Sequence, residues 1–246
     1  MAAIALLHAF PFGPAMFAAQ ERTLTEAGHD VVVPDLLSAE RAYPASQTDL
    51  SVMARYVLGV MADAGHQRFA VAGLSMGGYV AMALLRAASH RIEGLALLDT
   101  KASADTDAAV RNRLAYADRV EREGMSWVPE ATLDQLLGET SRETRVALVN
   151  RVRGWILGAD PAMVAWAQRA MADRPDATPE LSVFRRPALV LVGQEDTLTP
   201  LPEALAMAGA LGGAPMSQIP GAGHLAAVEC PNRVSDMLLT WASRLS

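Results

Sequence analysis

Ser75 lies in the segment Gly-Leu-Ser-Met-Gly-Gly at positions 73–78, between a short apolar run and a longer helical pattern. A serine at the tip of a tight strand-to-helix turn presents its hydroxyl group for nucleophilic attack, and flanking glycines leave room for the turn. The following helix also directs free backbone amides towards the same point. Gly-x-Ser-x-Gly alone occurs by chance in about one chain of this length in ten. The predicted strand before this segment and the predicted helix after it therefore favour Ser75 as a nucleophile. The alternative is an ordinary serine in a glycine-rich turn.

Two later loops carry the partners that a serine nucleophile needs, a base and an acid that orients the base. Asp196 ends the loop Gly-Gln-Glu-Asp, and His224 ends the loop Gly-Ala-Gly-His, in which two glycines leave the backbone free. Each loop follows an apolar run, and loops at the carboxyl ends of parallel strands meet at one edge of a sheet. We therefore predict Ser75 as nucleophile, His224 as base and Asp196 as acid.

The acid has two competitors. Glu195 directly precedes Asp196, and its position in the loop makes it the weaker candidate. Asp99 follows the apolar run Leu95–Leu98, where it could serve as the acid or could anchor the turn into the next segment. Asp196 is the predicted acid, with Asp99 as the alternative.

Short apolar runs alternate with longer amphipathic stretches along most of the chain. Several runs are apolar at every position, as in strands buried on both faces of a parallel sheet. This alternation is typical of a doubly wound α/β fold. The predicted strands are Ile4–Leu7, Val31–Val33, Phe69–Ala72, Leu95–Leu98, Ala188–Val192 and Met216–Ile219, and the predicted helices outside the interval described next are Ala15–Ala27, Asp49–Ala64, Met76–Ala88, Pro202–Leu211 and Pro231–Arg244.

One interval, residues 102–178, contains no predicted strand. Asp160 and Pro161 form a strong helix start there, because the Asp side chain accepts free amide hydrogen bonds and Pro fits the first turn. We predict a core formed by residues 1–101 and 179–246, with residues 102–178 inserted as a helical cap. The four helical patterns of the cap are Thr106–Glu123, Pro129–Gly138, Arg142–Leu157 and Pro161–Asp173.

Taken together, these motifs resemble those of the α/β-hydrolase superfamily, and within it the small bacterial carboxylesterases and 3-oxoadipate enol-lactonases. The resemblance implies the nucleophile–acid–base order of Ser75, Asp196 and His224. The family usually begins with an antiparallel strand pair that this chain lacks, so we expect about six strands, mostly parallel. The matching segments span almost the full chain: His-Ala-Phe-Pro at 8–11, Val-Pro-Asp-Leu at 33–36, Gly-Leu-Ser-Met-Gly-Gly at 73–78, Leu-Leu-Asp-Thr at 97–100, Gly-Gln-Glu-Asp at 193–196 and Gly-Ala-Gly-His at 221–224.

The resemblance also implies an oxyanion hole. In this fold, the loop after the first strand and the residue after the nucleophile each donate one backbone amide to the oxyanion. These positions correspond to the amides of Phe10 and Met76, whereas Pro11 has no amide hydrogen to donate. His8 is expected to brace the loop through side-chain hydrogen bonds.

Three of the four tryptophans, Trp127, Trp155 and Trp166, lie in the predicted cap. Ligand pockets are mostly apolar and often lie between domains. We therefore predict that at least one of these side chains roofs a pocket above Ser75. The alternative for each is that it packs the cap helices against each other and against the sheet.

Composition limits the classes of function. The 246 residues include 21 Lys and Arg against 27 Asp and Glu, a net charge of −6, with 51% hydrophobic residues. This is a globular composition and excludes a disordered chain. No basic stretch is present, so we expect binding neither to nucleic acid nor to an anionic membrane. The first residues lack a basic leader, and we expect the protein in the cytoplasm.

No cofactor is expected, because the sequence has no zinc-type cluster of His, Cys and carboxylate residues and neither a dinucleotide-binding nor a P-loop glycine pattern. The predicted function is hydrolysis of a small carboxylic ester or lactone through an acyl-enzyme, with a small-molecule substrate as the only expected partner. The same residues could instead cleave a thioester, an amide or a C–C bond, or perform perhydrolysis. A ligand-binding protein with little turnover is the alternative of another class. Monomer and homodimer both remain open.

Overall fold

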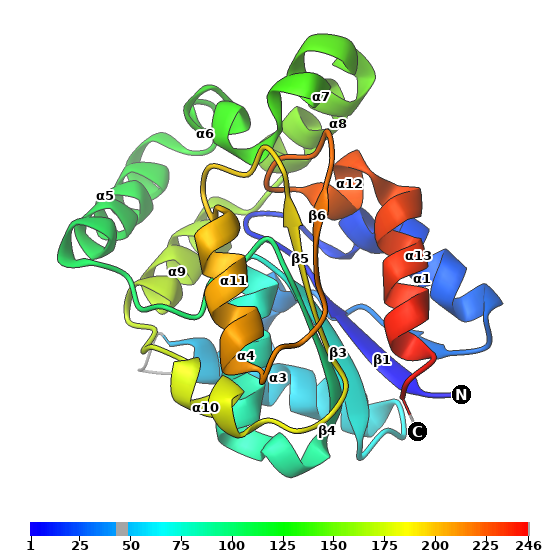
Figure 1. Cartoon of the computed structure of the whole chain (residues 1–246). Coiled ribbons are helices and arrows are strands. Elements are labelled where there is room, and N and C mark those ends of the chain that lie inside the picture. The colour runs from blue at the N-terminus through cyan, green and yellow to red at the C-terminus, as the bar shows by residue number, and fades with distance from the viewer. Residues whose placement is uncertain (43–48, 246) are drawn as a thin grey trace.

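The computed structural model describes residues 1–42 and 49–245. In this part of the chain, six parallel strands form one sheet in the order β2-β1-β3-β4-β5-β6 (Figure 1). The predicted doubly wound sheet is confirmed. β4 begins at Ile92, earlier than the predicted start at Leu95. The prediction missed the first residues of this strand because Glu93 and Gly94 interrupt its apolar run. The strands are β1 (Ala3–Leu7), β2 (Asp30–Val32), β3 (Phe69–Leu74), β4 (Ile92–Leu98), β5 (Ala188–Gly193) and β6 (Met216–Ile219).

Side chains of the inner strands alternate between two covered faces. In β1, Ala5 and Leu7 belong to the apolar cluster on one face, and Ile4 and Leu6 belong to the cluster on the other. All four are fully buried. Such a strand has no solvent-facing side, so its sequence is apolar throughout instead of alternating with polar residues.

Helices form a layer on each face of the sheet (Figure 1). One layer consists of α3 (Leu50–Asp63), α4 (Met76–Ala88), α10 (Thr178–Val183) and α11 (Leu201–Ala210). On the other face α1 (Ala18–Glu26) packs against α13 (Pro231–Ala242). Shorter turns of helix complete the core: η1 (Pro14–Phe17), η2 (Leu36–Ser38), α2 (Ala39–Ala42), η3 (Ser89–Arg91) and α12 (Ala226–Glu229).

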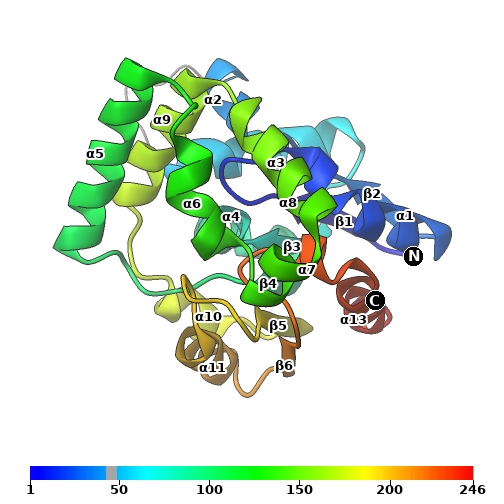
Figure 2. The ribbon, with the colours of Figure 1, turned by 90° about the horizontal axis from the view of Figure 1, so that it is seen from above.

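Between β4 and β5 the chain forms six helices, and the first five of them lie beyond the carboxyl ends of the strands (Figures 1 and 2). The Thr106 side chain accepts a hydrogen bond from the Ala109 amide at one helix start, and the Asp160 side chain accepts one from the Ala162 amide at another. Both contacts satisfy amides that a helix start leaves free. The five helices are α5 (Asp107–Glu123), α6 (Val128–Leu136), α7 (Glu139–Thr144), α8 (Val146–Leu157) and α9 (Pro161–Ala172).

Two details of this interval differ from the sequence-based expectation. The helix expected over Arg142–Leu157 is two helices, because Arg145 leaves the helical conformation (φ −127°, ψ 60°) and its guanidinium donates to the Glu229 carbonyl oxygen. In addition, α10 was not expected; it begins at Thr178 and packs against α4 and α11 of the core layer. The division into a core of 1–101 and 179–246 and a cap of 102–178 stays a prediction.

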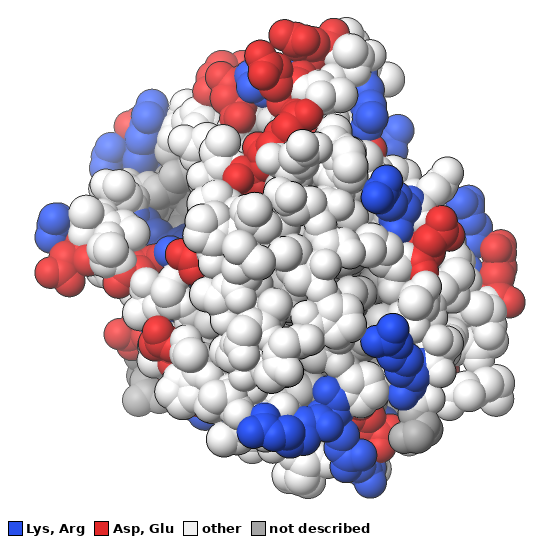
Figure 3. Space-filling model, in the orientation of Figure 1, with Lys and Arg blue, Asp and Glu red and all other residues white. Residues whose placement is uncertain are grey.

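The charged side chains are unevenly spread on the face seen in Figure 3. Acidic groups gather over α6 and α7, and basic groups lie along the lower edge and the right side, around a broad surface without charge over α11. Within residues 1–42 and 49–245, no helix combines the length and apolar character that crossing a bilayer requires.

Candidate active site

Ser75 occupies a strained turn between β3 and α4. Its backbone has φ 54° and ψ −113°, a conformation that residues other than glycine seldom adopt. A Cβ atom on Gly77 would lie 1.9 Å from the Leu7 carbonyl oxygen, and one on Gly73 would lie 2.3 Å from the Gly77 carbonyl oxygen. Side chains at these two positions are therefore excluded by backbone. The Thr100 hydroxyl group anchors the turn by donating to the Ser75 carbonyl oxygen at 2.9 Å.

The three residues predicted as nucleophile, base and acid lie together. His224 Nε2 is 2.8 Å from Ser75 Oγ, and His224 Nδ1 is 2.9 Å from Asp196 Oδ2. The loops after β5 and β6 bring Asp196 and His224 to the carboxyl edge of the sheet, next to the turn after β3. These atoms form a continuous path for a proton from the serine hydroxyl group to the imidazole, with the carboxylate on the far side of the ring.

Asp196 is fixed in its ionised form by several donors. Its Oδ1 atom accepts from the amides of Leu198 and Thr199, and its Oδ2 atom accepts from the Thr199 hydroxyl group at 2.6 Å and faces His224. Burial alone would raise its pKa, but the hydrogen bonds from His224 and Thr199 hold the pKa below the ordinary value. Thr199 was not predicted, although a threonine three residues after an aspartate is a common turn pattern.

The two competing carboxylates contact other groups. Asp99 is fully buried, and its oxygens accept from the Gly193 amide at 2.7 Å and the Ala226 amide at 3.0 Å. Burial, together with the negative charge of Asp196, raises the pKa of Asp99 well above its ordinary value. Glu195 accepts from the amide and hydroxyl groups of Thr140 at the start of α7. Each therefore joins loops together instead of contacting His224.

A buried glutamate that the sequence did not indicate also holds the His224 loop. Glu229 Oε1 accepts from the Gly223 amide at 2.8 Å and from the Leu225 amide at 3.3 Å. Its Oε2 atom accepts from the Gly138 amide at 2.9 Å, between α6 and α7. Burial raises the pKa of Glu229. One side chain thus joins the residues on both sides of His224 to the helical interval.

The amides of Phe10 and Met76 lie on two sides of the nucleophile turn, after β1 and at the first residue of α4. Within residues 1–42 and 49–245, neither amide donates a hydrogen bond to another protein group. His8 supports the first of these loops from below: its Nε2 atom accepts from the Leu36 amide at 2.8 Å, and its Nδ1 atom donates to the Ala9 carbonyl oxygen at 3.0 Å. The oxyanion role of the two amides stays a prediction.

A cavity of about 400 Å³ opens above Ser75 and His224. Its lining is mixed: Phe10, Tyr79 and Leu136 are apolar or aromatic, and Asn112, Gln135 and Gln168 are polar. Among the described residues, no three His, Cys, Asp or Glu side chains are grouped as metal ligands, there or elsewhere. The helical interval and its flanks contribute Lys101, Asp105, Ala109, Asn112, Arg113, Tyr116, Ala131, Thr132, Gln135, Leu136, Gln168 and Met171 to the lining.

None of the three tryptophans predicted to roof the pocket is among the described residues that line this cavity. Tyr116, on α5, lies between Phe10 and Trp127, with ring centroids 5.9 Å and 5.0 Å apart respectively, so that Trp127 packs behind the cavity wall. Trp155 packs edge-to-face on Phe12 and lines a separate hollow. Trp166 packs against the apolar cluster beneath α9. Trp127 therefore packs the start of α6 against α5, Trp155 and Trp166 pack against residues of the core, and Tyr116 lines the cavity.

We expect Tyr116→Ala to change substrate preference and Trp155→Ala to change stability. Removing the Tyr116 ring enlarges the cavity, and the preference for longer over shorter p-nitrophenyl esters should rise by about tenfold or more. Removing the half-buried Trp155 ring should lower the free energy of unfolding by roughly 3 kcal/mol without altering the profile. Melting temperatures and a chain-length profile of both variants check this. If only Trp155→Ala changed the chain-length profile, Trp155 and not Tyr116 would contact the substrate.

The chain is similar to several known proteins. Residues 2–231 match a family model described as alpha/beta hydrolase fold. A thermophilic esterase from Thermogutta terrifontis, solved with malate bound, is 36% identical, with 99% of this chain and 90% of that chain covered and a TM-score of 0.92. The enol-lactonase from Burkholderia xenovorans LB400 is 22% identical (98% and 91% covered, TM-score 0.85). A hydrolase from Pseudomonas aeruginosa PA01 is 25% identical (98% and 89% covered, TM-score 0.83). No curated protein sequence matches the chain significantly.

Proposed function

The chain belongs to the α/β-hydrolase family, and from this premise we propose that it is a serine hydrolase that cleaves a small carboxylic ester or lactone. The superfamily resemblance predicted from the motifs is confirmed. The observation that carries the proposal is the hydrogen-bonded path from Ser75 Oγ through His224 to Asp196 at the floor of the cavity. An esterase 36% identical to the chain supports the same reaction class.

In the proposed reaction, Ser75 Oγ attacks the substrate carbonyl carbon while His224 Nε2 takes the hydroxyl proton. The resulting oxyanion accepts hydrogen bonds from the amides of Phe10 and Met76, each contributing on the order of 10²–10³ to the rate. Collapse of this intermediate breaks the bond to the alkoxide, which receives the proton from His224. Asp196 keeps Nδ1 protonated and stabilises the imidazolium that forms between these steps.

Water then completes the cycle. With His224 again as base, a water molecule attacks the acyl group on Ser75, a second oxyanion forms between the same two amides, and the acid leaves as Ser75 recovers its proton. A cavity of about 400 Å³, at the small end of the range for ligand pockets, suits an ester with a short acyl and a short alcohol part.

The proposal is tested by labelling and turnover together. A fluorophosphonate probe should label the protein at Ser75, and the protein should hydrolyse p-nitrophenyl acetate or a small lactone from a panel of both kinds. Ser182→Ala, an exposed serine on α10, is the matched control and should keep both properties. Labelling without turnover of any substrate in the panel would favour a binding protein, and loss of label in Ser182→Ala would place the nucleophile elsewhere.

A further inference from the structure

One carboxylate in the cavity region contacts three cations. Asp105 Oδ1 lies 3.2 Å from Lys101 Nζ, and Asp105 Oδ2 lies 2.5 Å from Arg113 Nε and 2.7 Å from Arg174 Nη1. The Asp105 side chain is only 2% exposed. Within the described residues, no second carboxylate lies at ion-pair distance from any of the three cations. The cluster therefore carries an excess of two positive charges.

Two of the three cations bring this excess positive charge to the cavity. Lys101 and Arg113 both line the cavity above Ser75, and their side chains are each 21% exposed. Arg113 uses Nε on Asp105 and Nη1 on Gln168, which leaves Nη2 without a protein acceptor in the described chain. The Lys101 ammonium group makes no hydrogen bond there beyond its ion pair with Asp105. Donors of both cations are thus free to face a ligand.

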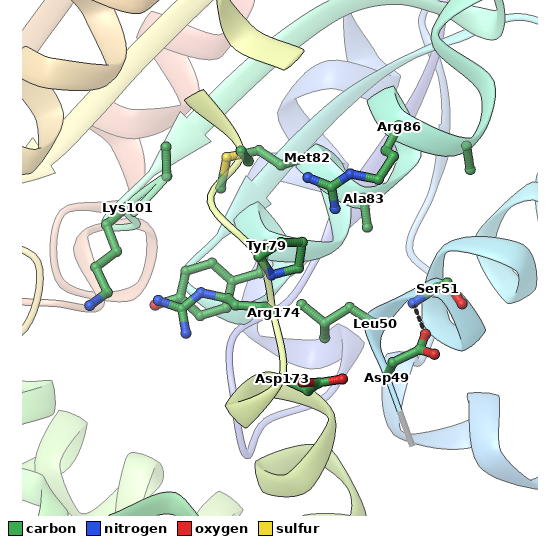
Figure 4. A pocket seen from close by; sticks show the side chains of 14 residues that line it. Asp49, Leu50, Ser51, Tyr79, Met82, Ala83, Arg86, Lys101, Asp173 and Arg174 are labelled. Carbon is green, nitrogen blue, oxygen red and sulfur yellow. Dashed lines mark hydrogen bonds between the residues drawn. The ribbon is translucent and has the colours of Figure 1, made fainter. Parts of the chain in front are cut away.

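Arg174 holds the cluster from behind and is itself satisfied. Its side chain is 4% exposed, its guanidinium carbon lies 4.1 Å from the centre of the Tyr79 ring, and it donates to the Ser103 carbonyl oxygen at 2.9 Å. Figure 4 shows this guanidinium across the face of Tyr79, with the Lys101 ammonium group close by. Tyr79 and Lys101 line the cavity above Ser75 and also a second hollow, which Arg174 lines as well. Arg174 positions Asp105, and Asp105 positions Lys101 and Arg113.

Partly buried cations with free donors gain most from a bound anion, because charge-assisted hydrogen bonds are stronger where water is displaced. The planar guanidinium of Arg113 suits a two-oxygen acceptor. The Asp105 carboxylate stays in the site and repels a group with two negative charges more than a singly charged carboxylate group, which disfavours a phosphate monoester.

We infer that Lys101 and Arg113 bind a carboxylate of the substrate, so that the protein acts on an ester or lactone whose acyl or alcohol part carries a free carboxylate. The ester half of this statement rests on the proposed function. The carboxylate half rests on the cation cluster and can be tested without turnover.

The first test compares two substrates that differ in charge alone at one end. The wild type should hydrolyse monomethyl succinate with a higher kcat/KM than dimethyl succinate. Arg113→Met and Lys101→Met should each lower the ratio of the two kcat/KM values by about tenfold to a hundredfold, the range expected for a hydrogen bond to a charged group. Arg111→Met, which removes a positive charge from an exposed position of the same helix, should keep the wild-type ratio. A wild-type ratio at or below one overturns the inference, as does an unchanged ratio in both cavity variants.

The second test measures binding to Ser75→Ala by titration calorimetry. Succinate should bind, succinamide should not, and addition of Lys101→Met or Arg113→Met should weaken succinate binding by about tenfold or more. Arg113→Lys, which keeps the charge beside Asp105, serves if Arg113→Met does not fold. Equal binding of succinate and succinamide overturns the inference even if esters are hydrolysed. Charge-dependent succinate binding without hydrolysis of any ester leaves the carboxylate site standing and rejects the proposed function.

Discussion

Ser75→Ala should lower kcat for p-nitrophenyl acetate by on the order of 10⁶ while the protein stays folded. The Ser75 hydroxyl group is the acceptor or donor partner of His224 Nε2 at 2.8 Å, and no other hydroxyl group in the described structure contacts that nitrogen. Alanine removes only this oxygen and leaves the strained turn, the two glycines and the contact with Thr100 as they are. The melting temperature should therefore change little.

A second variant tests whether Ser75 and His224 act in the same reaction step. His224→Ala removes the base, and the double variant Ser75→Ala/His224→Ala should be no slower than either single variant, because the two residues act as one unit. Circular dichroism controls for folding of all three. Activity of Ser75→Ala within about tenfold of the wild type, or effects of the two changes that multiply, would show that the residues do not act together in one reaction.

The fold and the proximity of Ser75, Asp196 and His224 could be predicted because their signals are local. A buried parallel strand is apolar at every position, and β1 and β3 are covered on both faces, so their sequences identify them without knowledge of their neighbours. The turn around Ser75 needs glycines at fixed offsets because backbone atoms approach within contact distance. Short-range sterics of this kind leave a pattern in the sequence.

The cavity lining could not be predicted because it depends on how helices turn relative to each other. Tyr116 lies on α5, and Trp127 lies at the start of α6. Which of the two rings lines the cavity depends on how α5 and α6 pack near Phe10. Composition favoured the tryptophans, which are the larger apolar groups. The structure places the smaller ring of Tyr116 in the cavity wall, whereas Trp127 packs on Tyr116 and Trp155 packs on Phe12.

Long-range support of the His224 loop also left no local signal. Glu229 lies in a short apolar segment before Pro231, and nothing in that segment indicates that its oxygens accept from amides beside His224 and in the helical interval. A carboxylate in an apolar run is unfavourable unless it is paired or hydrogen-bonded, so its presence there could have suggested a buried acceptor but not its partners.

Asp196→Asn should lower kcat by on the order of 10³–10⁴ with little change in KM, because an asparagine amide cannot replace the carboxylate that keeps His224 Nδ1 protonated. Because the pKa of Asp196 is held low, its ionised form also stabilises the fold above the pKa of the unfolded chain, and this contribution is lost as pH falls through the folded value. The variant should therefore lack this part of the acid sensitivity. Kinetics with p-nitrophenyl acetate and unfolding at several pH values measure both effects.

Asp99→Asn should show the opposite pattern, with a small kinetic effect and a loss of stability. Asn offers one oxygen where Asp99 offers two to the amides of Gly193 and Ala226, and leaving one buried amide without an acceptor costs about 1–3 kcal/mol. Burial raises the pKa of Asp99, so wild-type stability falls as pH rises from the unfolded pKa towards the folded one, a loss that asparagine cannot show. The stability gap between wild type and variant should therefore be widest at low pH and narrow as pH rises. If Asp99→Asn instead lowers kcat more than Asp196→Asn, the acid of the site is on β4, and the contact between Asp196 and His224 is not the one that catalysis uses.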